Sequence, residues 1–285
     1  MFQRFGGPFY FTRKVVVHNL TSTVLADLIA LTCIGGCFLA EPSQPAAPIE
    51  APMPPPIRES ADAFYNDGHT IRVDRYQPDT FGKHPAVLLL PGADGVKKHV
   101  EEYREAARLC ARNGYVVLLV HYFDRFGIEQ ETDPVKIKGL FFGLMATVSH
   151  AVQFAAGLEN VDDEHIALVG HSLGAYLALS VAPAEKAPKI AAVVDFYGAL
   201  PSQFRKGAEQ MPPALILHGE PDQTVPVQEA HDLAKRLNEK GRIYEIHLYA
   251  DQGHGFQGPA KEDAIRRTLA FLEKHLKTPS EVAAR

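Results

Sequence analysis

A serine inside a glycine-flanked pentapeptide is the residue of this sequence best suited to covalent chemistry. The pentapeptide GHSLG at 170–174 follows the apolar run 166–169 and leads into a second apolar run over 173–182. A sharp turn between a strand and a helix strains the backbone at its central residue and leaves room only for small flanking residues. Such a turn lifts the hydroxyl above the sheet, at the positive end of the helix. We therefore predict that Ser172 is a nucleophile.

A serine hydroxyl needs a base and a group that orients the base. For a nucleophile on a strand–turn–helix segment, the chain order is Ser, then Asp or Glu, then His. Asp222 lies in the loop HGEPDQTVP, and His254 lies in the loop ADQGHGF. Both loops follow apolar runs and would leave the carboxyl ends of strands, at the same sheet edge as Ser172. The sequence therefore predicts a Ser172–His254–Asp222 triad.

Other acidic and histidine residues near these motifs have weaker assignments. Asp195 follows another apolar run and stays an alternative for the acid. Asp251 is three residues before His254 and is better suited to shaping that turn. His218 is interpreted as a packing residue at a strand end, and His171 and His121 lie near the predicted site without being in position for the base.

Acyl transfer also requires donors for a developing oxyanion. The backbone N–H of Leu173, directly after the nucleophile, is the first predicted donor. The second is the N–H of Ala93, in the glycine-rich loop PGADG that follows the apolar run 86–90. This loop has neither the Lys-Ser/Thr pair of a phosphate-binding loop nor the spacing of a dinucleotide fingerprint, so a phosphate site is disfavoured.

The elements that would position these residues alternate between two patterns. Short continuous apolar runs are typical of strands covered on both faces of a parallel sheet; they occur at 86–90, 116–120, 166–169, 191–194 and 214–217. Apolar stripes of helical period lie between and after them, at 100–110, 148–155, 230–237 and 265–276. Further strands are expected at 71–76 and 243–249. The alternation predicts an α/β fold with a mostly parallel central sheet and right-handed crossovers.

The segment 122–139 has no clear period and follows a predicted strand. Ligands of open α/β sheets bind beyond the carboxyl ends of the strands. We interpret this segment as an irregular loop, either facing the substrate or simply exposed to solvent.

Composition excludes several classes of protein. The 285 residues carry 29 Lys and Arg against 34 Asp and Glu, a net charge of −5. This disfavours a nucleic-acid partner, since dedicated binders have a basic excess. Three cysteines cannot form a disulfide scaffold, and no Cys/His spacing predicts a metal site. We expect no cofactor, and no unbroken apolar stretch reaches the length of a membrane span.

The N-terminal region differs from the rest of the chain. Residues 1–40 combine early basic residues with an uncharged run over 28–40 that suits an export signal. The run contains IGGC, which resembles a bacterial lipoprotein processing box with Cys37 as the lipidated residue. Residues 41–57 are rich in proline and predict an extended linker. We expect an exported protein, periplasmic or tethered to a membrane as a lipoprotein; a cytoplasmic protein is the alternative.

The body of the chain resembles the dienelactone hydrolase family of the α/β-hydrolase superfamily. The resemblance covers roughly 65–277 and rests on LLLPGADG, GHSLG, VVDFYGA, ILHGEPDQTVP and DQGHGF. It implies a three-layer α/β-hydrolase domain over 58–277, followed by a short tail at 278–285, with helices on both faces of the sheet. It also implies the triad Ser172, Asp222 and His254 and the oxyanion donors Ala93 and Leu173.

The sequence departs from the family at two positions. Members that cleave dienelactones use a Cys nucleophile and a Glu in the oxyanion loop, where this chain has Ser172 and Gly92. We therefore expect a serine hydrolase of small-molecule carboxylic esters or lactones, working through an acyl-enzyme. Arg125 is a candidate contact for an anionic substrate. A peptidase of the same fold, or a binding protein that keeps only the fold, is the alternative.

Overall fold

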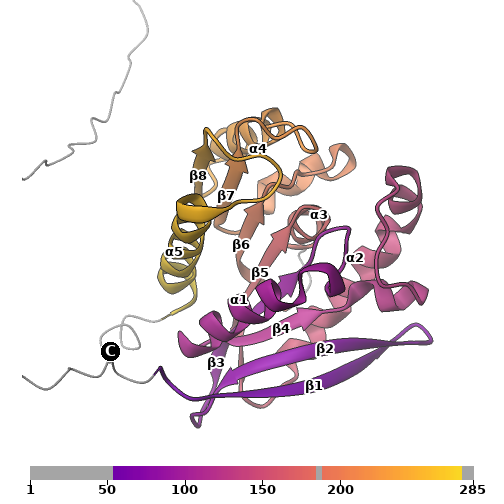
Figure 1. The fold of residues 1–285 in the computed structure, drawn as a ribbon, viewed down its shortest axis with the longest axis vertical. Helices are drawn as coiled ribbons and strands as arrows, with labels where there is room; N and C mark the ends of the chain where they lie inside the picture. The colour runs from indigo at the N-terminus through magenta and orange to yellow at the C-terminus, as the bar shows by residue number, and fades with distance from the viewer. Residues whose placement is uncertain (1–53, 184–187, 278–285) are drawn as a thin grey trace, which may run out of the picture. The chain divides into compact units, whose positions relative to one another are not determined.

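The computed structural model describes residues 54–183 and 188–277, which form one eight-stranded sheet with helices around it (Figure 1). The strand order is β1-β2-β4-β3-β5-β6-β7-β8. Strands β3 to β8 are parallel to one another, β2 pairs antiparallel with β4, and β1 pairs antiparallel with β2 at the edge of the sheet. The strands are β1 Ile57–Asn66, β2 His69–Pro78, β3 His84–Leu90, β4 Val116–Val120, β5 Val161–His171, β6 Ile190–Phe196, β7 Ala214–Gly219 and β8 Tyr244–Tyr249.

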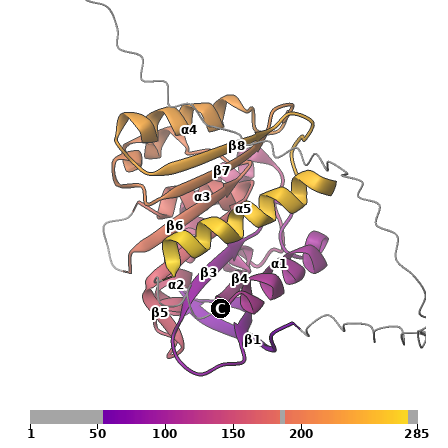
Figure 2. The ribbon, with the colours of Figure 1, turned by 90° about the vertical axis from the view of Figure 1, so that its left-hand side faces the viewer.

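The helices cover both faces of this sheet, giving three layers. Helices α1 (Val100–Arg112) and α5 (Gly258–Leu276) pack on one face, which is turned to the viewer in Figure 2. The other face carries α2 (Pro134–Ala156), α3 (Leu173–Val181) and α4 (Gln228–Glu239). Three shorter 3-10 segments are η1 Lys97–His99, η2 Tyr122–Phe126 and η3 Ser202–Gln210. The predicted α/β class and three-layer arrangement are confirmed.

The central strands have apolar side chains on both faces of the sheet. Every residue of β4 and β7 is buried, as are Pro85 to Leu90 of β3. A strand with no solvent-facing side needs no alternation, which is why these strands are continuous apolar runs in the sequence. The strands expected at 71–76 and 243–249 are also present, as β2 and β8.

Strand β1 is absent from the sequence prediction, which placed residue 57 in the linker. Six of its ten residues are exposed, and it pairs with β2 alone along the edge of the sheet. An edge strand of this kind lacks the apolar run that marks a central one. The strand nevertheless extends the sheet to Ile57.

The prediction of an irregular segment over 122–139 is wrong at both ends. Residues 122–126 form η2, and α2 begins at Pro134. The Asp133 carboxylate caps this helix by accepting the N–H of Val135 at 2.8 Å, and proline is favoured in the first turn. By length and composition α2 could cross a membrane, but its residues from Phe141 to Ala155 include a row buried in the core, as in any central helix of a soluble domain.

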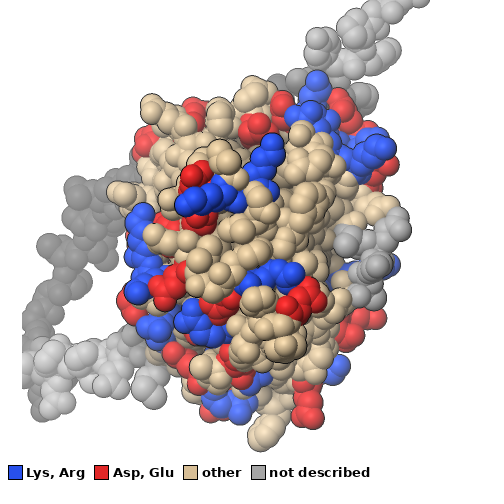
Figure 3. Space-filling model, turned by 90° about the vertical axis from the view of Figure 1, so that its right-hand side faces the viewer, with Lys and Arg blue, Asp and Glu red and all other residues tan. Residues whose placement is uncertain are grey.

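Surface charges occur largely as pairs of opposite sign. Arg108 meets Glu59 at 2.8 Å, Lys240 meets Glu209 at 2.6 Å, and Lys274 meets Glu245 at 2.8 Å. On the face drawn in Figure 3, basic and acidic side chains are interspersed around an area that carries neither. That face therefore presents no continuous field of one sign.

Candidate active site

Ser172 occupies a strained turn between β5 and α3. Its backbone has φ 51° and ψ −117°, a left-handed φ that is unfavourable for any residue with a side chain. The Ser172 N–H donates to the Phe196 carbonyl at 2.9 Å, which ties the turn to the end of β6. The hydroxyl therefore stands beyond the carboxyl ends of the strands, as predicted from the pentapeptide.

The two glycines of the pentapeptide are required by close backbone contacts. A Cβ on Gly170 would lie 2.4 Å from the Gly174 carbonyl oxygen. A Cβ on Gly174 would lie 2.2 Å from the Leu90 oxygen and 2.4 Å from that of Pro91. Both distances are far below van der Waals contact. Helix α3 can therefore pack against the end of β3 only because these positions lack side chains.

The structure brings the three predicted triad residues together. His254 Nε2 lies 2.8 Å from Ser172 Oγ, and His254 Nδ1 lies 2.8 Å from Asp222 Oδ2. Because a carboxylate oxygen can only accept here, Nδ1 carries the proton and Nε2 is left as an acceptor for the serine hydroxyl. The imidazole is thus held in the tautomer that can remove a proton from Ser172.

Asp222 is fixed by the backbone of its own loop. Its side chain is fully buried, and Oδ1 accepts the N–H groups of Thr224 at 2.8 Å and Val225 at 2.9 Å. His218, also fully buried, donates from Nε2 to the Val225 carbonyl at 2.8 Å and lies 3.5 Å from Asp222 Oδ2. The residue interpreted as strand-end packing therefore also braces the acid loop, and burial lowers its pKa.

The two segments that carry the predicted oxyanion donors both lie next to the serine. Leu173 is the first residue of α3, so its N–H has no carbonyl partner within the helix. Ala93 follows Gly92, where a Cβ would lie 3.6 Å from Ser172 Cβ. The loop after β3 thus passes directly beside the nucleophile.

A cluster of aromatic rings beside the imidazole was not predicted. Tyr197 has φ 46°, and its ring lies edge-on to His254 with centroids 4.9 Å apart. Phe256 packs against Tyr197 at 5.2 Å. His171 stacks on Phe196 at 4.5 Å, and burial lowers its pKa to about 4, so it is a neutral packing ring. In the sequence, Phe196 and Tyr197 appeared only as part of the motif VVDFYGA that carries the family resemblance.

Asp195 has a different environment from Asp222. It is completely buried, and its Oδ1 accepts the Gly198 N–H at 2.7 Å. Burial raises the pKa of this carboxyl to about 7. The carboxylate in contact with His254 is that of Asp222. Asp195 instead stabilises the turn after β6 that contains Tyr197, by accepting the Gly198 N–H.

The remaining predicted site residues lie elsewhere. The Arg125 guanidinium binds Asp67 in the β1–β2 turn at 3.0 Å, and it lies over the Phe126 ring. Cys37 is outside the described residues. Within the described ranges, no group of three or more His, Cys, Asp or Glu side chains is arranged to hold a metal ion.

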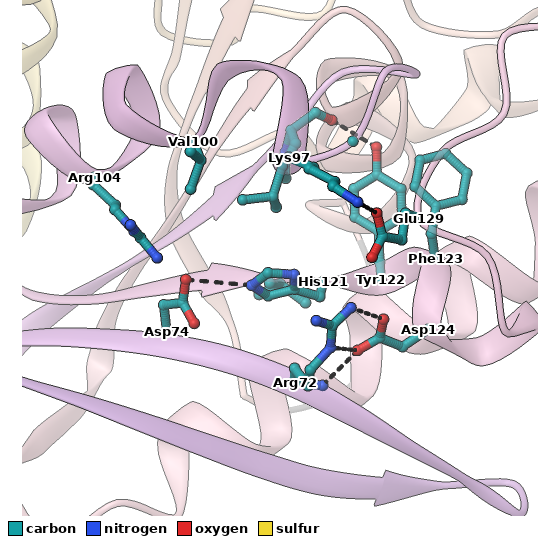
Figure 4. Close-up of a pocket in the computed structure, with 14 residues that line it drawn as sticks. Arg72, Asp74, Lys97, Val100, Arg104, His121, Tyr122, Phe123, Asp124 and Glu129 are labelled. Atoms are coloured by element: carbon teal, nitrogen blue, oxygen red, sulfur yellow. Dashed lines mark hydrogen bonds and ion pairs between the residues drawn. The ribbon is translucent and has the colours of Figure 1, made fainter.

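A pocket of about 250 Å³ is lined by residues of the loop after β3, of β2 and α1, and of η2 (Figure 4). Two pairs of its charged lining residues are in contact: Arg72 with Asp124 at 2.7 Å and Lys97 with Glu129 at 3.2 Å. Tyr122 also lines it, and none of the triad residues does. The pocket lining holds basic and acidic side chains in equal number, namely Arg72, Lys97 and Arg104 against Asp74, Asp124 and Glu129.

Comparison with known proteins agrees with this geometry. The chain matches the model of the dienelactone hydrolase family over residues 71–276. A Bradyrhizobium protein provisionally assigned as a 2-oxo-3-(5-oxofuran-2-ylidene)propanoate lactonase is 24% identical over 70% of this chain and 88% of its own.

Solved structures share the fold. A Klebsiella pneumoniae protein provisionally assigned as a dienelactone hydrolase superposes with a TM-score of 0.67 and 21% identity, covering 77% of this chain and 99% of its own. A fungal esterase structure from Rhizomucor miehei gives a TM-score of 0.59 and 18% identity, covering 79% of this chain and 85% of its own. With the family model matching most of its length, this chain belongs to the dienelactone hydrolase family.

Proposed function

We propose that this protein hydrolyses carboxylic esters or lactones with Ser172 as nucleophile, His254 as general base and acid, and Asp222 as the residue that orients His254. The observation that carries the proposal is a pair of 2.8 Å contacts: one joins Ser172 Oγ to His254 Nε2, and the other joins His254 Nδ1 to the Asp222 carboxylate. Membership of a hydrolase family supports the same reaction class.

In the first half of the reaction, Ser172 Oγ attacks the carbonyl carbon while its proton passes to His254 Nε2. Asp222 stabilises the charged imidazolium through Nδ1. The carbonyl electrons move onto oxygen, and the backbone N–H groups of Ala93 and Leu173 donate to that oxyanion. Collapse of the tetrahedral intermediate breaks the C–O bond, and His254 gives its proton to the leaving alkoxide.

The second half repeats these steps with water. His254 takes a proton from water as the water oxygen attacks the acyl carbon, and the same donors stabilise the new oxyanion. Ser172 leaves and recovers its proton from His254. In a lactone the leaving alkoxide stays attached to the acyl group, so one hydroxy acid is released.

The loop residue Gly92 supports esters and simple lactones over dienelactones. A Cβ here would lie 3.6 Å from Ser172 Cβ, and this is the position where the dienelactone-cleaving members that the chain resembles have a Glu beside a Cys nucleophile. A serine paired with His254 has no need of such a group.

A substrate panel tests this proposal. Purified protein would be assayed with p-nitrophenyl esters, an aliphatic lactone, a dienelactone and a chromogenic peptide, each beside Ser172→Ala. We expect hydrolysis of esters or lactones that the variant lacks. Peptide cleavage without ester cleavage would assign a peptidase, and failure to react with a fluorophosphonate probe would assign a protein that keeps the fold only.

We propose further that the protein is exported and anchored through Cys37. The support is in the sequence alone: the uncharged run 28–40, the box that ends at Cys37 and the proline-rich segment that would space the domain from a membrane. Mass spectrometry of the mature N-terminus tests this. A lipidated Cys37 as first residue is expected, and an unprocessed chain in the cytoplasm would contradict it.

A further inference from the structure

Two tyrosine hydroxyls hold the loop that carries Ala93. Tyr122, in η2 just after β4, donates its hydroxyl to the Pro91 carbonyl at 2.6 Å and reaches the Gly92 carbonyl at 3.1 Å. Tyr103, on α1, accepts the Gly92 N–H at 3.1 Å. Figure 4 shows the Tyr122 ring with its hydroxyl turned toward this loop. Both rings are buried, with 1% and 8% exposure.

These contacts fall on two consecutive peptide groups. The carbonyl of Pro91 and the N–H of Gly92 belong to one planar unit, so the two tyrosines hold it at opposite ends. The next unit joins the Gly92 carbonyl to the Ala93 N–H. Its carbonyl accepts from Tyr122 and from the Gly95 N–H at 3.0 Å. In a trans peptide the N–H points away from its carbonyl, so the Ala93 N–H is turned to the opposite side.

Fixing this peptide affects the strength of the donor as well as its direction. A carbonyl that accepts hydrogen bonds polarises its own peptide group, which makes the N–H a better donor. The next peptide, Ala93–Asp94, is held as well, because the Glu131 N–H donates to the Ala93 carbonyl at 3.0 Å. The backbone on both sides of Ala93 therefore has little freedom to rotate.

Tyr122 is able to keep this role across the working pH range. Burial raises the pKa of its hydroxyl well above the ordinary value, and burial does the same for Tyr103. Both hydroxyls therefore stay neutral, and Tyr122 keeps the proton that it donates. A phenylalanine at either position would retain the buried ring and remove only the hydroxyl.

We propose that Tyr122 is a positioning residue of the oxyanion site: its hydroxyl aims and polarises the Gly92–Ala93 peptide, which presents the Ala93 N–H. Tyr103 supports it by holding the N–H of the preceding Pro91–Gly92 peptide. This inference rests on the proposed function, since it assigns Ala93 as a donor to the oxyanion. Neither tyrosine would touch the substrate.

The test compares Tyr122→Phe with the native protein on a p-nitrophenyl ester. Loss of a direct oxyanion donor lowers kcat by about 10²–10³-fold. Because Tyr122 acts through the peptide, we expect a loss of about 10-fold in kcat with KM changed by less than about twofold. Phenylboronic acid, which forms a tetrahedral adduct on the serine, should bind about 10-fold more weakly. Loss of packing alone would not lower kcat and the affinity for phenylboronic acid by the same factor.

Three further variants make the outcome decisive. Tyr76→Phe is the matched control, because Tyr76 is a buried tyrosine opposite Val117, near the start of β4, and its ring lies below the Arg108 guanidinium. It should leave kcat unchanged. If Tyr122→Phe folds poorly, Tyr103→Phe tests the Pro91–Gly92 peptide instead, because Tyr103 accepts the N–H of that peptide. The double variant should lose less than the product of the two single losses, because both hydroxyls hold one peptide.

Ser172→Ala separates this inference from the proposed function. If Ser172→Ala is inactive and folded Tyr122→Phe or Tyr103→Phe keeps native kcat and boronate affinity, the positioning role is overturned while the serine mechanism stands. If Ser172→Ala retains the activity of the native protein, the proposed function itself fails. Rates are normalised to the folded fraction measured by circular dichroism.

Discussion

Asp222 and His254 meet at 2.8 Å although 32 residues separate them, and the second Asp222 oxygen is occupied by backbone N–H groups of its own loop. The carboxylate can therefore rotate little, and the imidazole that it binds is confined to one orientation. The acid thus determines which imidazole nitrogen faces Ser172.

Replacement of this acid should disable the base without removing it. In Asp222→Asn the amide oxygen can still accept from Thr224 and Val225, while the NH₂ group faces His254 Nδ1. The imidazole then carries its proton on Nε2 and cannot accept one from Ser172. We expect kcat to fall by about 10⁴-fold, as in a comparable triad.

A steady-state assay of Asp222→Asn beside Asp251→Asn checks this expectation. Asp251 lies in the same loop as His254 and is exposed, so its amide variant controls for the loss of one negative charge near the site. Asp251→Asn should stay within about twofold of the native rate. An equal loss in both variants would mean that charge near the loop, and not the tautomer of His254, controls the rate.

The close contact at Gly174 predicts a steric cost. An alanine here places Cβ 2.2 Å from the Leu90 oxygen, so β3 and α3 must separate. We expect Gly174→Ala to lower the free energy of unfolding by about 1–3 kcal/mol, as overpacking does elsewhere. It should also lower kcat, because Leu90 leads into the oxyanion loop.

Gly139 provides the opposite case. It lies within α2, and a Cβ there would meet nothing within 4 Å. Gly139→Ala should raise the free energy of unfolding by about 0.5–1 kcal/mol through helix propensity alone. Urea denaturation of both variants gives the two values, and the steric account is wrong if they change in the same direction.

Buried Asp195 should make stability fall as pH rises. Burial raises its pKa in the folded protein to about 7 from 3.8, so between these values the unfolded chain releases a proton that the folded chain keeps. The contribution of Asp195 to stability is thus fully present below its unfolded pKa and falls by up to roughly 4 kcal/mol as the pH rises to 7. Asp195→Asn keeps an oxygen for the Gly198 N–H and cannot ionise.

Chemical denaturation at pH 5 and pH 8 tests this dependence. The variant should gain stability relative to the native protein on going to pH 8. His171, whose pKa burial lowers to about 4, titrates alike in both proteins and cancels in the difference. A difference in unfolding free energy that does not change with pH would show that Asp195 is ionised in the folded state.

The sequence identifies the three residues that the structure brings into contact, because each is marked locally. Ser172 is recognisable by the glycines that its turn requires, and Asp222 and His254 follow apolar strands in the expected order. The central strands are equally visible, since burial on both faces leaves them with runs of apolar residues. These features depend on neighbours in the chain, which is why one sequence is enough to find them.

The features that were missed depend on neighbours in space. Tyr103 belongs to the apolar stripe of α1, and its ring does pack in the core, but only the fold brings its hydroxyl to Gly92. Strand β1 is mostly exposed and has no apolar run. The first turns of α2 are mostly exposed too, so they lacked the stripe that predicts a helix.

Hydrolysis of a p-nitrophenyl ester by Ser172→Ala is the most direct test of the account. Removing Oγ leaves the oxyanion donors and the fold in place but takes away the atom that forms the acyl-enzyme. Turnover should fall by about 10⁶-fold, with an unchanged circular dichroism spectrum and no labelling by a fluorophosphonate. A folded Ser172→Ala that hydrolyses the ester at the native rate would contradict the assignment of Ser172 as nucleophile.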